Sequence, residues 1–146
     1  MNMKKRKKTI TTLLCLVTLF YSSPGLAGSN PENWTGAATT IEKALKGALT
    51  TFREGKSEEA TEMVADAYFA IFESEKANME IAVRRFISFK VAIKIEKNFN
   101  KLRKAMHGKE DIKDIEARTA TLIADVKEAA LKLDRKGVGM NMKFNR

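Results

Sequence analysis

The absence of proline from Glu32 to Arg146 is the feature that most constrains the fold of this chain. Proline removes a backbone hydrogen-bond donor and breaks helix interiors, so a long stretch without it permits uninterrupted helices. Residues that favour helices, namely Ala, Lys, Glu and Leu, are abundant in the same stretch. We therefore expect an all-α domain.

Apolar residues recur every three or four positions in four segments, which predicts four amphipathic helices. We expect these helices over residues 34–54, 57–74, 79–106 and 110–136. Four amphipathic helices with short joints bury their apolar faces most simply as an antiparallel up-and-down four-helix bundle. This domain is predicted over residues 28–137.

Turn residues support these boundaries. Gly55, Gly108 and Gly137 each follow a polar or charged helix end, where a left-handed cap is expected. Asn78 precedes the third helix, and asparagine both tolerates left-handed geometry and caps the following helix. Residues 138–146 have no periodic apolar face, so we expect a disordered tail there.

The N-terminus resembles an export signal. The basic start MNMKKRKK is followed by an apolar stretch over residues 10–21 and by small residues at Gly25 and Ala27. This pattern is typical of a secretory signal peptide over residues 1–27, and the apolar stretch is too short to span a membrane comfortably. We therefore expect a periplasmic or otherwise extracytoplasmic protein with no transmembrane segment after cleavage. Cys15, the only cysteine, lies within the signal, so the mature chain forms no disulfide or thiolate site.

Charge and motifs narrow the function. Five of the 27 basic residues lie in the predicted signal, leaving 22 basic and 18 acidic residues, a net charge of +4. This small excess, in an exported protein, argues against nucleic-acid binding. The only histidine, His107, lies at a predicted helix end, and the chain has no Gly-x-Ser-x-Gly, phosphate-loop or His-Glu-x-x-His motif. We do not expect an enzyme.

Carboxylates on the second and third helices are candidate metal ligands, because clustered carboxylate oxygens suit iron or calcium. The spacing of Glu59, Glu62 and Asp66 places them on one helix face. Glu96 falls where the periodicity predicts a buried apolar residue, so it requires a partner. Glu73 and Glu80 flank the turn between the two helices.

Each candidate also has a purely structural interpretation. The acids of the second helix form a solvated face, matched by lysines at 90, 94, 97, 101 and 104 on the third. Glu96 pairs with a Lys, an Arg or an aromatic hydroxyl, while Glu73 and Glu80 cap the turn. The aromatic residues around these acids are expected to lie mostly in the core: Tyr68, Phe69, Phe72, Phe86, Phe89 and Phe99.

Several segments occur in an order that resembles a known family. They are NWTGAATTIEKAL, FREGKSEEA, DAYFAIFE, NMEIAVRRFIS, IEKNFNKLRKAM and ALKLDRKG. The series of matching positions is Tyr68, Phe69, Phe72, Glu73, Met79, Glu80, Arg84, Ser88, Glu96, Phe99 and Arg103. Residues 32–137 are similar to the N-terminal extracytoplasmic domain of bacterial high-affinity, oxidase-dependent iron permeases (the iron/lead transporter family).

The resemblance implies an accessory module of iron uptake. Family members continue into a membrane permease that handles iron, whereas this sequence ends after the soluble part, so we expect either a stand-alone module or part of a permease. The module is expected to bind Fe²⁺ or Fe³⁺ transiently, or to dock to a membrane iron permease or a periplasmic metal-binding protein. The expected iron ligands are Glu73, Glu80 and Glu96, with Glu59, Glu62 and Asp66 as a second site. The alternative is a ligand-free helical interaction module.

Overall fold

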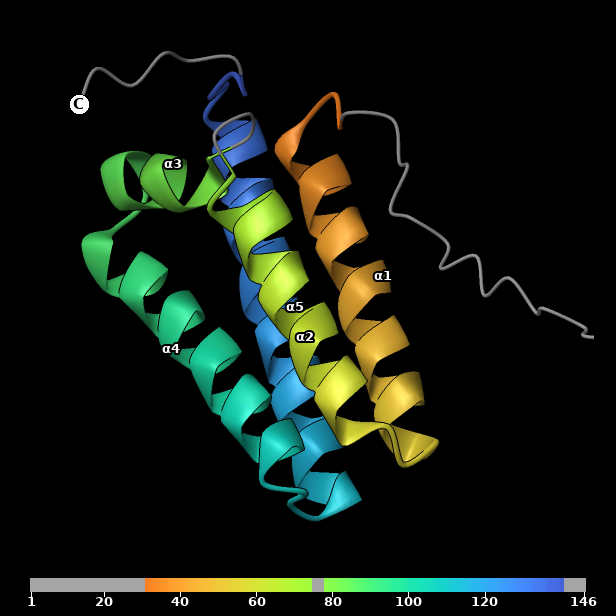
Figure 1. Cartoon of the computed structure of the whole chain (residues 1–146). Coiled ribbons are helices and arrows are strands. Elements are labelled where there is room, and N and C mark those ends of the chain that lie inside the picture. Colours follow the sequence, from red (N-terminus) through yellow and green to blue (C-terminus); the bar gives the residue numbers. More distant parts are fainter. Residues whose placement is uncertain (1–30, 75–77, 141–146) are drawn as a thin grey trace, which may run out of the picture.

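The computed structural model describes residues 31–74 and 78–140, and in these ranges the regular secondary structure is all helical (Figure 1). Its elements are α1 (Trp34–Arg53), α2 (Ser57–Ala67), the π-helix η1 (Tyr68–Phe72), α3 (Met79–Phe86), α4 (Phe89–His107) and α5 (Ile112–Arg135). The all-α prediction is therefore confirmed. The predicted signal peptide lies outside the described residues.

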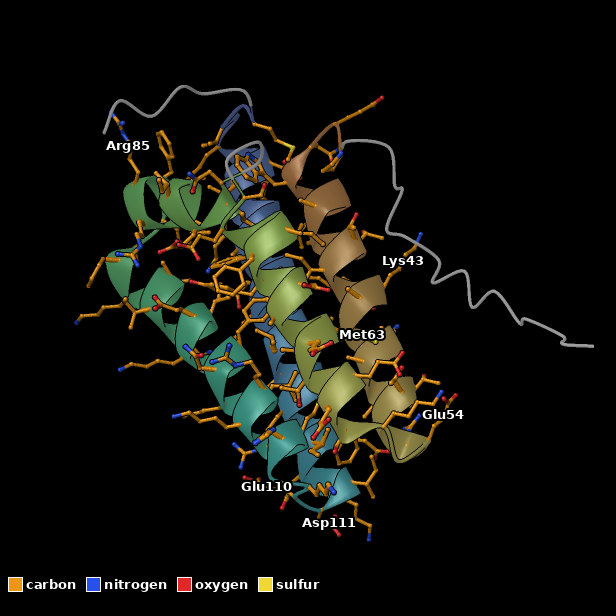
Figure 2. The ribbon with its side chains drawn as sticks, viewed as in Figure 1. Lys43, Glu54, Met63, Arg85, Glu110 and Asp111 are labelled. Carbon is orange, nitrogen blue, oxygen red and sulfur yellow. The ribbon has the colours of Figure 1, made fainter. Side chains whose placement is uncertain are left out.

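The four longer helices lie side by side, and α3 crosses one end of them (Figure 1). Helix α1 packs against α5 and α2, α2 also packs against α4, and α4 packs against α5. Each helix buries one apolar face, and these faces form a single core between the helices. Figure 2 shows charged side chains such as Lys43, Glu54 and Asp111 directed outward from it.

The predicted third helix is wrong as a single element. It breaks at Ile87 and Ser88, where the extended backbone of Ser88 starts α4 and its hydroxyl accepts a hydrogen bond from the Lys90 amide at 3.1 Å. This is an N-cap, and it directs α3 away from the axis of α4. The predicted second helix is also modified, because its last turn is the π-helix η1.

The turn predictions are confirmed at three positions and wrong at one. Gly55 and Gly137 have φ angles of +83° and +66°. Asn78 has φ 39°, and its side chain accepts a hydrogen bond from the Ile81 amide, as a left-handed cap requires. Gly108 has φ −74°, and the left-handed residue is its neighbour Lys109, at φ 53°.

Hydrogen bonds join the start of α1 to the end of α5 and to the residues that follow it. Asp134 accepts hydrogen bonds from the Trp34 and Thr35 amides at 3.0 and 2.9 Å, so a side chain of α5 caps the start of α1. The Trp34 indole, which is fully buried, donates to the carbonyl of Val138. Val138 is itself buried, so packing continues past the predicted domain end at 137, and residues 141–146 lie outside the described residues.

Candidate functional site

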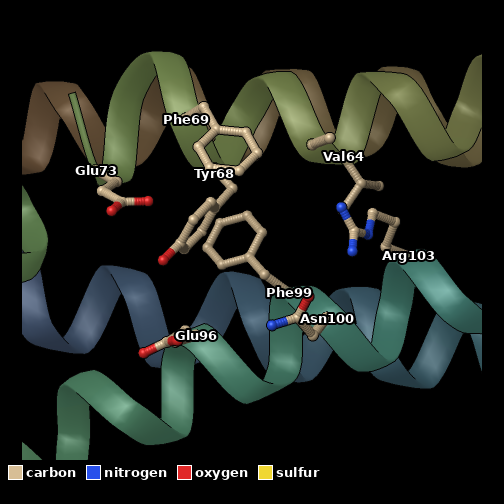
Figure 3. Close-up of a pocket in the computed structure, with 9 residues that line it drawn as sticks. Val64, Tyr68, Phe69, Glu73, Glu96, Phe99, Asn100 and Arg103 are labelled. Atoms are coloured by element: carbon tan, nitrogen blue, oxygen red, sulfur yellow. The ribbon is translucent and has the colours of Figure 1, made fainter.

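The aromatic pocket is a cavity of about 320 Å³ between the α2–η1 segment and α4. Its walls include Tyr68, Phe69, Glu73, Glu96, Phe99 and Arg103. Figure 3 shows the carboxylates of Glu73 and Glu96 to one side of the rings and the guanidinium of Arg103 to the other. The volume lies at the lower end of the range of small-molecule sites.

The π-helix supplies one wall of this pocket. The Glu73 amide donates to the Tyr68 carbonyl at 2.9 Å, the i to i+5 bond of a π turn. The Tyr68 ring makes an edge contact with Phe69 of the same turn, at 5.0 Å between ring centroids, and another with Phe99 of α4, at 5.3 Å. Phe72 is fully buried behind them, whereas Phe69 is 59% exposed. π turns are rare and occur frequently at functional sites.

Phe69 and Phe89 correct the prediction that these aromatics belong to the core, because both are 59% exposed. For Phe89 the cause is the break at Ser88, which resets the helical phase. The buried face of α4 consequently includes Ala92, Ile95 and Phe99 rather than Phe89 and Ile93. The predicted stripe had assumed one continuous helix through this point.

Glu96 also lies outside the core, because the neighbouring Ile95 takes the buried position on α4. The Glu96 side chain is 33% exposed, and the buried carboxylate is instead Glu80, at 8% exposure. Both acids pair with one cation, since Arg84 forms an ion pair with Glu80 and lies 3.4 Å from the Glu96 carboxylate. The Arg84 guanidinium also covers the Phe89 ring at 5.0 Å.

Arg84 therefore joins α3 to α4 and neutralises two of the predicted iron ligands. Its Nε atom is buried and has no hydrogen-bond partner among the described residues. Sequence reasoning did not assign Arg84 to Glu80, although their i, i+4 spacing on one helix is a recognisable signal for an ion pair. The partner that Glu96 requires is a protein cation in this structure.

Three of the predicted ligands influence Tyr68. Burial raises the pKa of the Tyr68 hydroxyl, and so do the negative charges of Glu73, Glu80 and Glu96 and a hydrogen bond to Glu73. These causes all favour the neutral phenol. The acids thus lie around one hydroxyl, with Tyr68 as a donor and Arg84 as the neighbouring cation.

The second predicted site has a different arrangement. Glu59, Glu62 and Asp66 are all exposed on α2. Of the lysines predicted to match these acids, Lys94 instead pairs with Asp125 of α5 at 2.7 Å. Lys104, by contrast, lines a surface pocket together with Glu62. Among the described residues, no three His, Cys, Asp or Glu side chains gather closely enough to hold a metal ion.

Comparison with known proteins identifies no relative. No family model matches this chain, and neither does any curated protein or solved structure. Within the described ranges, no helix combines the length and apolarity that a membrane span requires.

Proposed function

We propose that the protein is an exported helical accessory module of iron uptake that docks to a membrane iron permease or to a periplasmic metal-donor protein. The setting of this proposal comes from the sequence alone, through the predicted export signal and the resemblance to iron permeases. An antiparallel up-and-down four-helix bundle is the proposed framework, with the aromatic pocket as its contact surface.

The observation that carries this proposal is the exposed aromatic ring of Phe69 at the mouth of a pocket. A large apolar side chain that remains 59% exposed gains little for the isolated fold. Aromatic side chains set in pockets are frequent centres of binding energy between proteins. Docking also agrees with the ion pairs of Arg84, because a protein cation already neutralises Glu80 and Glu96.

Site-specific photo-crosslinking tests this docking role. A photoreactive phenylalanine analogue replaces Phe69 in the full chain, and the matched control replaces Leu131, which is 46% exposed on α5. Irradiation of cells that express the chain is expected to give an adduct with an iron permease or a metal-donor protein from position 69 alone. Equal adducts from both positions, or none from position 69, would contradict the proposal.

Iron binding by Glu73, Glu80 and Glu96 is a second candidate, favoured by the convergence of their charges on the Tyr68 hydroxyl. An incoming cation would have to displace Arg84 from two carboxylates. Substitution of Arg84 by Gln is therefore expected to strengthen iron binding if this candidate holds. Substitution of Glu73 and Glu80 by Gln would weaken it.

Calorimetric titration of the purified protein with Fe²⁺ distinguishes these outcomes. Glu59→Gln is the matched control for the primary acids, because Glu59 is exposed on α2 and belongs to the weaker predicted trio with Glu62 and Asp66. Iron binding that is lost in Glu59→Gln but retained in Glu73→Gln would assign the iron site to Glu59, Glu62 and Asp66. An absence of heat in every variant leaves docking as the function.

A further inference from the structure

The aromatic pocket has opposite charges at its two ends. Glu73 is exposed and has no cationic partner among the described residues, and Arg103 is half-buried with neither an ion pair nor a hydrogen bond in those ranges. Figure 3 places them on opposite sides of the rings. Among the described residues, the only hydrogen-bond partner of the Glu73 carboxylate is the neutral Tyr68 hydroxyl, and neither charge is paired with an opposite one, so both are available to a ligand that carries both signs.

The spacing of the charges sets the size of that ligand. Glu96, which lines the same end as Glu73, precedes Arg103 by seven residues on α4. At about 1.5 Å of rise per residue, the two positions are about 10 Å apart along the helix. A metal ion or a small amine would occupy only the acidic end, and inorganic phosphate only the basic one.

An extended peptide segment matches this arrangement. Alternate side chains of an extended chain point the same way, about 7 Å apart, so positions 1, 3 and 5 of a segment face one surface and span about 14 Å. The long side chains at positions 1 and 5 lean inward to meet charges about 10 Å apart. A cation at the first position reaches Glu73 and the faces of the pocket rings. An apolar side chain at the third contacts Phe69 and Phe99, and a carboxylate at the fifth meets the fork of Arg103.

We infer that the aromatic pocket receives an extended segment of the docking partner in which a lysine or arginine and an acidic residue flank an apolar side chain at alternate positions. This inference rests on the proposed docking role and names the chemistry that the partner presents. It assigns Glu73 and Arg103 as the residues that set specificity, with Phe69 and Phe99 as the apolar contact.

Nuclear magnetic resonance titration of the purified protein provides the test. The probe is the peptide Ala-Lys-Ala-Leu-Ala-Glu-Ala, acetylated and amidated so that its ends carry no charge. Resonances of Tyr68, Phe69 and Phe99 are expected to shift. Replacing the peptide leucine by alanine is expected to weaken binding about tenfold, and replacing either charged residue by glutamine about two- to fivefold.

A double-mutant cycle then assigns each contact. The loss caused by removing the peptide lysine is expected to disappear in Glu73→Gln, and the loss caused by removing the peptide glutamate to disappear in Arg103→Gln. Glu59→Gln and Lys101→Gln, exposed residues of α2 and α4 outside the pocket, are the controls and are expected to bind like the parent. Circular dichroism checks that every variant is folded.

Two results would overturn the inference. One is the absence of resonance shifts at millimolar peptide. The other is that removing a charge from the peptide weakens binding equally in the parent and in Glu73→Gln or Arg103→Gln. If the photoreactive residue at position 69 still captures a permease or metal donor in either case, the peptide chemistry is wrong and docking stands. If that crosslink also fails, the docking role falls with it.

Discussion

Two seams between helices are built very differently in this molecule. At the α1–α5 seam, Asp134 caps the start of α1, and the Trp34 indole donates to the Val138 carbonyl. Two ion pairs also cross it, Arg53 to Glu116 at 2.6 Å and Lys127 to Glu42 at 2.9 Å. At the α2–α4 seam, no hydrogen bond or ion pair crosses between the two helices in the described residues, and a cavity lies where α2 passes into η1.

The difference separates what holds the fold from what is available for binding. Buried alanines on α1 and α5 permit close packing of these helices: Ala37, Ala38, Ala44 and Ala48 on α1, and Ala129 and Ala130 on α5. At the other seam, aromatic rings line the pocket and Phe69 is exposed. Variants of the closed seam should therefore change stability, and those of the open seam should change binding.

The largest effect is expected at Trp34. Its ring is fully buried, so Trp34→Ala should lower the free energy of unfolding by about 3–5 kcal/mol through lost burial and the cavity left behind. Trp34→Phe keeps a smaller ring but loses the donor to Val138 and part of the buried volume, and is expected to cost about 1–3 kcal/mol. Chemical denaturation measures both.

Leu131→Ala, at an exposed position of α5, is the control for Trp34 and is expected to change stability by less than about 0.5 kcal/mol. Equal losses for Trp34→Ala and Leu131→Ala would mean that the start of α1 is not held at the closed seam. The contrast between the two seams would then fail.

A smaller loss is expected at Arg84, which joins α3 to the open side of the molecule. Arg84→Met leaves the buried Glu80 carboxylate without its cation and should lower the free energy of unfolding by about 1–3 kcal/mol. Adding Glu80→Gln removes the unpaired charge, so the double variant should regain much of that loss. If the double variant is no more stable than Arg84→Met, ion pairing is not what holds α3.

The sequence indicated the helices well but not their interruptions. Asn78 and Gly55 were recognisable because each residue type favours the geometry found there. The break at Ser88 was missed because apolar residues continue at helical spacing on both sides of it. Ser88 was a signal in principle, as a serine that caps a helix start, but many serines lie within or between helices without capping.

The candidate site was harder to predict because it depends on three-dimensional packing. The buried acid is Glu80 rather than Glu96, since Ile95 occupies the buried face of α4 and Glu96 lies beside it. Phe69 lies two residues after the buried Ala67, which already places it on the opposite face of the helix, whereas amphipathic periodicity contains no signal for the π turn of η1. Arg103 is a candidate binding residue because it lines the pocket, and its sequence position alone does not indicate this.

The Tyr68 hydroxyl gives a pH-dependent prediction. Burial and the nearby acids raise its pKa in the folded protein above the ordinary value of about 10. Between these two values the unfolded chain loses a proton that the folded protein keeps, so the stabilising contribution is complete below pH 10 and is lost as pH rises further. Unfolding free energy should therefore fall more steeply above pH 10 in the parent than in Tyr68→Phe.

Denaturation at pH 8 and pH 11 measures this difference in slope, and other titrating groups are common to both proteins. Ultraviolet titration offers a direct check, because Tyr68 is the only tyrosine outside the predicted signal peptide. Parallel slopes in the parent and Tyr68→Phe would show that the acids do not act on this hydroxyl. The open seam would then lack the charge arrangement described for it.

The smallest effect on stability is expected at the centre of the open seam. Phe69→Ser removes a ring that is 59% exposed and should change the free energy of unfolding by less than about 0.5 kcal/mol. Phe72, three residues later in the same π turn, is fully buried, so Phe72→Ala should cost about 3–5 kcal/mol. Phe69→Ser is nevertheless expected to abolish binding of the lysine–leucine–glutamate peptide, because its ring forms the apolar contact at the mouth of the pocket. A stable Phe69→Ser protein that binds the peptide normally would show that an open seam alone does not make a binding site.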